Sequence, residues 1–251
     1  DIAEVMLMAE MEESGQERGV IWSGMEEYLK IMQESIQQGL GKDIKSLGGL
    51  IGGNAWRLQQ YAASGGMSGP IALKAAAYAL AVTEVNAAMG KVIAAPTAGS
   101  SGTLPGVIAA LQEELQLSAD KAGAAIGKII ASLATLSGAE GGCQAECGSA
   151  AAMAAAAAVY MCGGQLEMCF DAAAMALKSL LGLVCDPVAG LVEVPCSKRN
   201  AIGVSHALLC ADMALAGITS FIPFDEIVEA MARVGRMMSP DFKETALGGC
   251  S

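Results

Sequence analysis

The chain has 251 residues, of which 53 % are hydrophobic but only 4 % aromatic, and 31 are glycine. This length is enough to bury a substantial core, and the composition requires that core to consist of Ala, Leu, Val, Ile and Met. With 15 Lys and Arg against 26 Asp and Glu, the net charge of −11 argues against binding to nucleic acid or to an anionic membrane surface. We therefore expect no nucleic-acid partner and no membrane partner.

The residue pattern predicts an all-α fold. Few stretches alternate polar and apolar residues as a half-buried strand would. Because no repeat, linker or low-complexity tail is visible, we expect one domain over residues 1–251. We predict a single Ala- and Gly-rich helical domain with a central apolar helix and irregular loops that carry cysteines. The acidic stretch from Glu4 to Glu34 is typical of a solvated helix face.

The first residues indicate a compartment. Residues 1–15 carry Glu4, Glu10, Glu12 and Glu13, without the basic start and apolar run of a signal peptide. We therefore expect a cytoplasmic protein. In that reducing environment its eight cysteines stay reduced or bind metal and do not form disulfides.

Helical periodicity predicts the following elements in chain order. Residues 22–38 place their large apolar side chains on one face, and Gly39 follows as a stop signal. Pro70 opens a helix at its first turn, and Gly90 is the expected C-cap. The other expected elements are turns around a short helix near Trp56, a helix beginning at Thr103, and helices over 118–136, 147–166, 171–183, 201–219 and 225–238.

The neutral segment CGSAAAMAAAAAVYMCGGQL at residues 147–166 has two interpretations. Its 20 uncharged residues are long enough in principle to span a membrane. However, Ala and Gly gain little from lipid, and the neighbouring residues show no positive-inside asymmetry. We therefore favour the central helix of a large bundle over a membrane span.

Three of the eight cysteines are expected to be packing residues. Cys162, Cys169 and Cys210 lie among apolar helix residues, where a reduced cysteine usually behaves as a small hydrophobic side chain. The same interpretation fits Cys185 and Cys196 poorly, because they bracket a loop that contains charges and two prolines.

Metal binding is the alternative for the other cysteines. Cys143 follows a Gly-Gly turn and precedes Cys147 by four residues, and Cys185 and Cys196 bracket the loop with prolines. Thiolates from such segments can hold a metal ion or a cluster. The spacing matches neither the paired cysteines of a zinc finger nor a ferredoxin run, so spacing alone leaves both alternatives open.

The TAGSSG loop is a candidate anion site. Gly99 and Gly102 let its backbone turn N–H groups inward, just before a helix N-terminus. The hydroxyls of Thr97, Ser100 and Ser101 are further donors. Because no Lys follows the last glycine, the loop is no phosphate P-loop and suits a carboxylate better than a triphosphate. An ordinary capped turn is the alternative for this segment.

A basic segment follows the last loop cysteine. Lys198, Arg199 and Asn200 come directly after Cys196, and two adjacent cations there can neutralise a substrate carboxylate. A solvated turn is the alternative. His206, the only histidine, lies in an apolar helix, where a hydrogen-bonded core histidine is favoured over a catalytic one. No Ser–His–Asp or Cys–His site is therefore supported.

Three segments together resemble one known family. The segments KVIAAPTAGSSGTLPGV, EGGCQAECGSAAAMAAAA and CDPVAGLVEVPCSKRNAIG look like the α subunit of iron–sulfur-dependent L-serine dehydratase. The resemblance spans roughly Gly39 to the C-terminus. It implies a [4Fe–4S] cluster held by Cys143, Cys185 and Cys196, with Cys147 as a neighbour and not a ligand.

The resemblance also implies an aconitase-like elimination. Three thiolates leave one iron without a protein ligand, and this Lewis acid binds the serine hydroxyl so that hydroxide can leave. A base removes the α-proton, and the resulting aminoacrylate tautomerises and hydrolyses to pyruvate and ammonia. The residues expected to bind and orient the carboxylate are Thr97, Ser100, Ser101 and Gly102 of the TAGSSG loop, together with Lys198, Arg199 and Asn200. In some family members a terminal cysteine caps the fourth iron, and Cys250 is the candidate for that part.

The partners implied by the resemblance are L-serine as the small-molecule substrate, a β subunit and a higher oligomer. No residue of this chain is a convincing base, so we expect the base to come from the β subunit. One alternative is a cysteine desulfidase-like lyase with the same cluster. Another, of a different class, is a non-catalytic helical membrane or scaffold protein.

Overall fold

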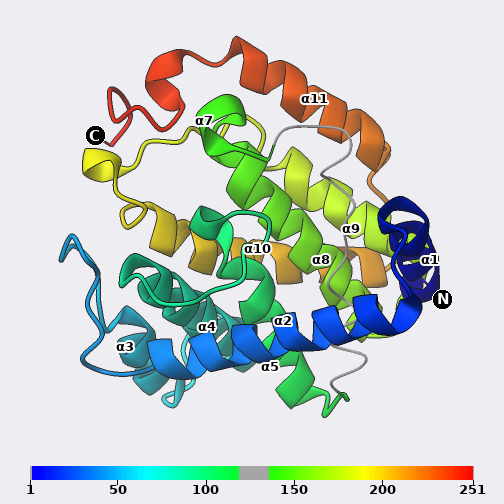
Figure 1. Cartoon of the computed structure of the whole chain (residues 1–251), viewed down its shortest axis with the longest axis horizontal. Helices are drawn as coiled ribbons and strands as arrows, with labels where there is room; N and C mark the ends of the chain where they lie inside the picture. The colour runs from blue at the N-terminus through cyan, green and yellow to red at the C-terminus, as the bar shows by residue number, and fades with distance from the viewer. Residues whose placement is uncertain (1, 119–135, 251) are drawn as a thin grey trace.

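The computed structural model describes residues 2–118 and 136–250; the helix predicted over 118–136 falls almost entirely outside them. The described residues form helices joined by turns, with one isolated bridge of extended backbone between Cys185 and Lys243 (Figure 1). The all-α prediction is confirmed, and the single-domain division stays a prediction. The helices are α1 (Ile2–Ser14), α2 (Arg18–Gly39), α3 (Asn54–Ala62), α4 (Pro70–Ala87), α5 (Thr103–Glu114), α7 (Gly138–Gly141), α8 (Ser149–Met161), α9 (Leu166–Lys178), α10 (Cys196–Leu215) and α11 (Phe224–Met237), with short 3₁₀ turns η1 (Ala98–Ser100), η3 (Val188–Gly190) and η4 (Pro240–Phe242) and a π-helical turn η2 (Gln144–Gly148).

Helix α8 lies in the middle of the molecule and packs against α5, α9 and α10 (Figure 1). Most of its alanines, including Ala151, Ala154, Ala155 and Ala158, are almost completely buried. Methyl side chains let the neighbouring helices approach closely, and their burial provides much of the apolar core that the few aromatic residues do not. The predicted central apolar helix is confirmed.

This central helix is shorter than the predicted segment 147–166. It has 13 residues, whereas a membrane span needs about 20. Gly163, with a φ of 84°, has the left-handed conformation that commonly follows the end of a helix. Within residues 2–118 and 136–250, no helix is both long and apolar enough to cross a membrane.

The start of α10 differs from the prediction in a way that matters for the site. The helix begins at Cys196, five residues before the predicted start at Ala201. Both prolines of the preceding loop lie before its first turn, and Pro195 is its N-cap, so neither breaks a helical hydrogen bond. The prediction of an irregular loop up to Asn200 was therefore wrong for residues 196–200.

Helix α4 joins the first helices to the core, because it packs against α2, α3, α5 and α10. It begins at Pro70, as predicted. Its buried Glu84 accepts hydrogen bonds from the backbone N–H of Asn54 at 2.8 Å and from the Asn54 side-chain amide at 2.7 Å. A carboxylate at this position caps the N-terminus of α3, whose own N-cap residue is a glycine.

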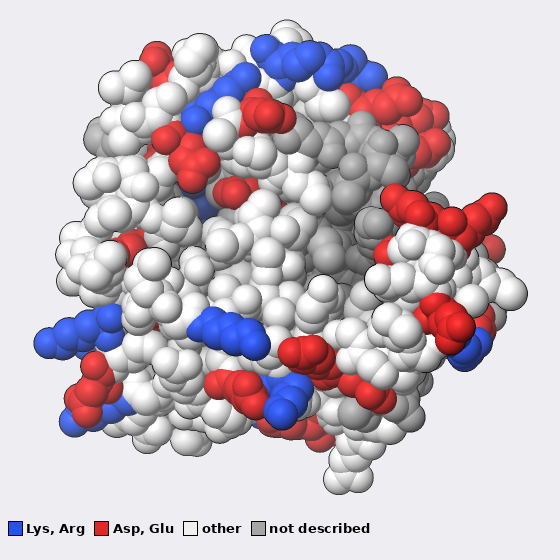
Figure 2. Space-filling view, in the orientation of Figure 1, with Lys and Arg blue, Asp and Glu red and all other residues white. Residues whose placement is uncertain are grey.

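The charged residues lie mainly around the edge of the face shown in Figure 2, where acidic and basic side chains are interspersed. Uncharged residues cover much of the middle of that face. The net charge of −11 gives the chain no excess of cations for a polyanion.

Candidate functional site

Three buried thiols meet where the chain enters α8. Cys143 directly precedes the π-helical turn, Cys147 lies within that turn, and Cys185 follows α9 in sequence. The Sγ atoms of Cys143 and Cys147 are 3.3 Å apart, and none of the three residues is more than 3 % exposed. The thiols of Cys143 and Cys185 and a carboxylate oxygen of Glu146 all lie within 4.8 Å of one another. Thiols and a carboxylate at this separation can hold a metal ion.

Cys196 approaches this group from the first residue of α10. It is 8 % exposed, and burial, together with the negative charges of Cys143 and Glu146, raises the pKa of its thiol to about 12. The N-terminus of a long helix acts in the opposite direction, because its N–H groups favour a thiolate. The structure thus brings the predicted ligands Cys143, Cys185 and Cys196 to one region from three segments; their role as cluster ligands stays a prediction.

Cys143 is the thiol of this group that loses its proton most readily. Hydrogen bonds from Cys147 and Cys185, together with the positive charge of Arg199, hold the pKa of Cys143 well below its ordinary value. The same hydrogen bonds and burial raise the pKa values of the Cys147 and Cys185 thiols. A compact group of thiols in which one thiolate is already favoured is suited to a thiophilic metal or an iron–sulfur cluster.

Glu146 is a site residue that the sequence analysis missed. Burial raises the pKa of its carboxyl to about 7, against a hydrogen bond from Thr97 that lowers it, and the charge of Cys143 adds to the increase. The Glu146 carboxylate packs closely against Gly138, because a Cβ atom at Gly138 would lie 2.8 Å from Oε2 of Glu146. The available signal was a single carboxylate at the start of an otherwise neutral Ala-rich stretch, three residues after Cys143.

The predicted anion loop lies beside Glu146, but several of its donors are used inside the loop. The Thr97 hydroxyl contacts the Glu146 carboxylate and lies 3.1 Å from Oγ of Ser100. Ser100 and Ser101 are fully buried, and the Ser101 hydroxyl donates to the Ala98 carbonyl at 2.8 Å. Thr97 is therefore the hydroxyl of this loop that faces Glu146, while the two serines stabilise the loop itself.

The N-terminus of α5 is occupied by a side chain of the protein. The backbone N–H groups of Gly102 and Thr103 donate to Oδ1 of Asn200 at 2.9 and 3.2 Å. A Cβ atom at Gly102 would collide with the Ala79 carbonyl oxygen of α4. Close packing against α4 therefore requires a glycine at position 102. Substrate contact by Ser100, Ser101 and Gly102 stays a prediction, whereas the amide of Asn200, the fourth residue expected to contact the substrate, is engaged within the protein.

The two basic residues after Cys196 lie in different environments. Lys198 is exposed. The Arg199 side chain is 17 % exposed; its guanidinium forms a 2.7 Å ion pair with Asp186 and donates to the Val184 carbonyl at 3.0 Å. Burial would lower the pKa of Arg199, but the charges of Cys143 and Asp186 raise it, so the group stays charged. Of the predicted basic pair, Arg199 is the one placed beside the thiols.

The C-terminal segment runs along the loop that carries Cys185 (Figure 1). The Cys185 N–H donates to the Phe242 carbonyl, and the Glu244 N–H donates to the Cys185 carbonyl, both at 2.8 Å. Farther along, the N–H of Cys250 donates to Oδ2 of Asp186 at 2.9 Å. The exposed Cys250 is thus held against the residue that follows Cys185. Its part as a fourth ligand stays a prediction.

The cysteines expected to be packing residues divide into two groups. Cys169 and Cys210 are buried, as predicted, but Cys162 is exposed, so the prediction was wrong for that residue. The reason is that α8 ends one residue earlier, and Cys162 caps it at the surface. Nε2 of His206 lies 2.9 Å from the Ala176 carbonyl oxygen, so the predicted hydrogen bond is confirmed, although the residue is half-buried and not in the core.

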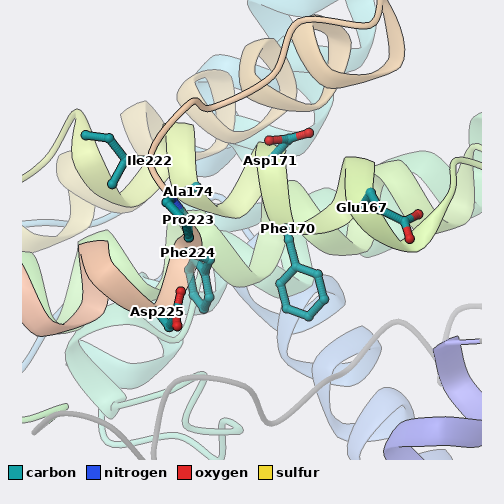
Figure 3. A pocket seen from close by; sticks show the side chains of 8 residues that line it. All are labelled: Glu167, Phe170, Asp171, Ala174, Ile222, Pro223, Phe224 and Asp225. Atoms are coloured by element: carbon teal, nitrogen blue, oxygen red, sulfur yellow. The ribbon is translucent and has the colours of Figure 1, made fainter.

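A cavity of about 530 Å³ opens between α9 and the start of α11 (Figure 3). Phe170 and Phe224 line it with ring centroids 6.2 Å apart, and Asp171 and Asp225 lie at its margins. None of the described residues that line this cavity is a predicted site residue, so the cavity is separate from the thiol site.

The fold and the site define an all-α protein with a buried group of thiols suited to a soft metal ion or a cluster. A sequence profile of the serine dehydratase alpha chain family matches residues 1–251, and the chain belongs to that family. It is 49 % identical to the probable L-serine dehydratase, alpha chain, of Bacillus subtilis, over 99 % of this chain and 85 % of that protein.

Two further relatives agree with this assignment. The L-serine dehydratase, alpha chain, of Peptoniphilus asaccharolyticus is 44 % identical, over 99 % of this chain and 87 % of that protein. L-serine dehydratase 1 of Escherichia coli is 42 % identical, over 68 % of this chain and 40 % of that protein. The resemblance inferred from the three segments is confirmed.

Proposed function

We propose that this chain is the catalytic α chain of an L-serine dehydratase, which converts L-serine to pyruvate and ammonia with the help of a [4Fe–4S] cluster. The family and the names of the relatives support the substrate and the reaction. The observation that carries the cluster proposal is the approach of both Cys185 and Cys196 to Cys143, from three separate segments.

The donor set fits an iron–sulfur cluster. Cys143, Cys185 and Cys196 would hold it, and all three are buried, as the ligands of a protected cluster need to be. Cys143 precedes the turn into α8 and Cys196 begins α10, so helix N–H groups support two of the thiolates. When bound, the cluster supplies an open iron position, a Lewis acid for the hydroxyl that leaves.

The remaining groups of this chain would bind and orient the substrate carboxylate. We place that carboxylate between the guanidinium of Arg199, which lies beside Cys143, and the hydroxyl of Thr97, which contacts Glu146. Ser100, Ser101 and Asn200 would maintain the shape of the Thr97 loop, and Lys198 lies at the surface.

From this arrangement we expect substitutions of Arg199, Thr97 and Lys198 to differ in their effects on KM for serine. A charge-assisted contact contributes about 1.5–3 kcal/mol, so Arg199→Ala should raise KM for serine at least about tenfold. Thr97→Val should raise it less, because a neutral hydrogen bond contributes about 1 kcal/mol. Lys198→Ala should leave it nearly unchanged.

The proposed enzyme also contains a β chain as the partner of this chain. The B. subtilis and P. asaccharolyticus relatives are named alpha chains, which implies a second kind of chain in those enzymes. We assign the base that removes the α-proton to that partner. A cytoplasmic location, where thiols stay reduced, is also part of the proposal.

The test is iron and sulfide analysis of anaerobically prepared protein, with pyruvate formation from serine measured on the same sample. Cys143→Ser, Cys185→Ser and Cys196→Ser should each lose the cluster, whereas Cys169→Ser and Cys210→Ser should retain it. Full iron content in Cys185→Ser would contradict the ligand set. If L-cysteine were consumed faster than L-serine, the desulfidase alternative would replace the dehydratase.

A further inference from the structure

Asn200 joins three parts of the site through one side chain. It lies on α10 one turn after Cys196 and is fully buried. Its side chain crosses from α10 to the loop that carries Thr97 and to the first residues of α5.

The hydrogen bonds of this amide are saturated. Oδ1 accepts from the N–H of Gly102 at 2.9 Å, and from the N–H and the hydroxyl of Thr103, both at 3.2 Å. Nδ2 donates to the Gly99 carbonyl at 2.8 Å and to the Cys196 carbonyl at 2.9 Å. Because an amide has two N–H donors and one carbonyl oxygen, none remains for a ligand.

The Asn200 oxygen takes the place that an anion would take at the start of α5. Backbone N–H groups at a helix N-terminus are the usual donors to a carboxylate or phosphate, and here those of Gly102 and Thr103 point at Oδ1. The helices also leave no room there, since a Cβ atom at Gly203 would lie 3.3 Å from Oγ1 of Thr103. The substrate therefore cannot use this helix terminus while Asn200 holds it.

We propose that Asn200 is a positioning residue that fixes the Thr97 loop relative to Cys196 and does not touch the substrate. The inference rests on the proposed function for its catalytic consequence. The carbonyls of Gly99 and Cys196 are bound by the same amide group, so the loop and the first turn of α10 cannot move independently. Thr97 then stays at a constant distance from a predicted ligand of the cluster.

The test uses two variants of Asn200 and one matched control. Asn200→Ala removes all five hydrogen bonds, whereas Asn200→Asp keeps an oxygen for Gly102 and Thr103 and loses both donors. The control is Asn86→Asp, because the Asn86 amide also donates to a carbonyl of this loop, that of Ala98, but from an exposed position.

The first measurement is hydrogen exchange of the cluster-free protein. In Asn200→Ala the amides of Gly102 and Thr103 should exchange at least about tenfold faster, because their acceptor is gone. In Asn200→Asp they should stay protected. Unchanged protection of both amides in Asn200→Ala would overturn the proposal. Should Asn200→Ala not fold, Asn200→Leu, which is close in size but offers no acceptor to either N–H group, must show the same faster exchange at Gly102 and Thr103.

The second measurement is steady-state kinetics of the reconstituted enzyme. A displacement of about 1 Å in a site can cost about 100-fold in rate, so kcat/KM for serine should fall 10- to 100-fold in Asn200→Ala and Asn200→Asp, through kcat as well as KM. Asn86→Asp should change it less than twofold. A rise in KM alone, with protection unchanged, would make Asn200 a substrate ligand and overturn the proposal. If the parent protein bound no iron and formed no pyruvate, the proposed function would be wrong. The exchange data would still test whether Asn200 fixes the Thr97 loop.

Discussion

The thiol of Cys147 lies 3.3 Å from the thiol of Cys143 and is buried to nearly the same extent. Cys147 lies in the π-helical turn that precedes α8, and Cys143 is the residue just before that turn, so the segment that presents one predicted ligand also presents a second thiol. The family resemblance leaves Cys147 outside the ligand set. A buried thiol beside a ligand then serves to fill space and to exclude water from it.

Cys147→Ala should therefore keep the cluster. We expect iron and sulfide contents after anaerobic reconstitution to match those of the parent protein, while the free energy of unfolding falls by about 1 kcal/mol for the small cavity. Cys143→Ala, at the other end of the same contact, should lose iron. A folded Cys147→Ala protein without iron would place Cys147 among the ligands.

The architecture around α8 was predictable because it depends on local composition. A neutral run of alanines has no polar side to face water, so in a helical bundle it is expected among other helices, and the structure places α8 in that position. The start of α10 was not predictable in the same way. Pro195 is compatible with either a loop or a helix cap, and the choice depends on contacts such as that between Asn200 and the α5 N-terminus.

The predicted ligand cysteines and the rest of the site also differ in how far the sequence reveals them. Cys185 and Cys196 stood out because a loop with charges and prolines is a poor place for a packing cysteine. Glu146 carries only the weak signal of a lone carboxylate near Cys143, and Asp186 is one of two carboxylates in the loop, so the importance of both comes mainly from neighbours far away in sequence. Glu146 lies against Thr97, and Asp186 lies against Cys250 and Arg199.

Exposure to air should remove activity before it affects the fold. An open iron position can be oxidised and lost, whereas the helical core is apolar and needs no metal to remain buried. Circular dichroism before and after exposure should look alike, while dehydratase activity falls and returns on incubation with iron, sulfide and thiol. Loss of helicity in step with activity would mean that the cluster has a structural role.

Glu193 should make the free energy of unfolding depend on pH. It is 3 % exposed and accepts hydrogen bonds from the Ser46 hydroxyl at 2.6 Å and from the N–H groups of Gly48 and Leu50 at 2.8 and 3.1 Å. Burial would raise the pKa of Glu193, but these donors lower it below its ordinary value. The ionised side chain thus ties the loop at residues 46–51 to the segment between Cys185 and Cys196.

Glu193→Gln should lower the free energy of unfolding at pH 7 by about 1.5–3 kcal/mol, the range for hydrogen bonds to a charged group. Because the pKa is lower in the folded state, the stabilisation is present above the ordinary pKa of glutamate and is lost as the pH falls through the folded value. The difference between the two proteins in urea unfolding should therefore shrink from pH 7 toward pH 3.5. The exposed Glu27→Gln is the control, and a difference that widened in acid would contradict the assignment.

Asp186 connects the C-terminal segment to the site, because it forms an ion pair with Arg199 and accepts the N–H of Cys250. Close contact is required there: Gly249 has a φ of 79°, and a Cβ atom on it would lie 2.5 Å from Oδ2 of Asp186. Asp186→Asn keeps the shape but removes the charge. We expect the free energy of unfolding to fall by about 1.5–3 kcal/mol, and trypsin to cleave at Lys243 several times faster.

The control for that substitution is Glu229→Gln, which removes an ion pair to Arg233 between two side chains that are each more than half exposed. Such a pair contributes about 0.3–0.5 kcal/mol, so this variant should unfold and be cleaved nearly as the parent protein is. The comparison separates loss of a buried charge from loss of any charge. If Asp186→Asn were cleaved at Lys243 at the parental rate, the segment from Pro240 to Cys250 would be held by its backbone pairing with Cys185 alone, and Asp186 would have no part in retaining it.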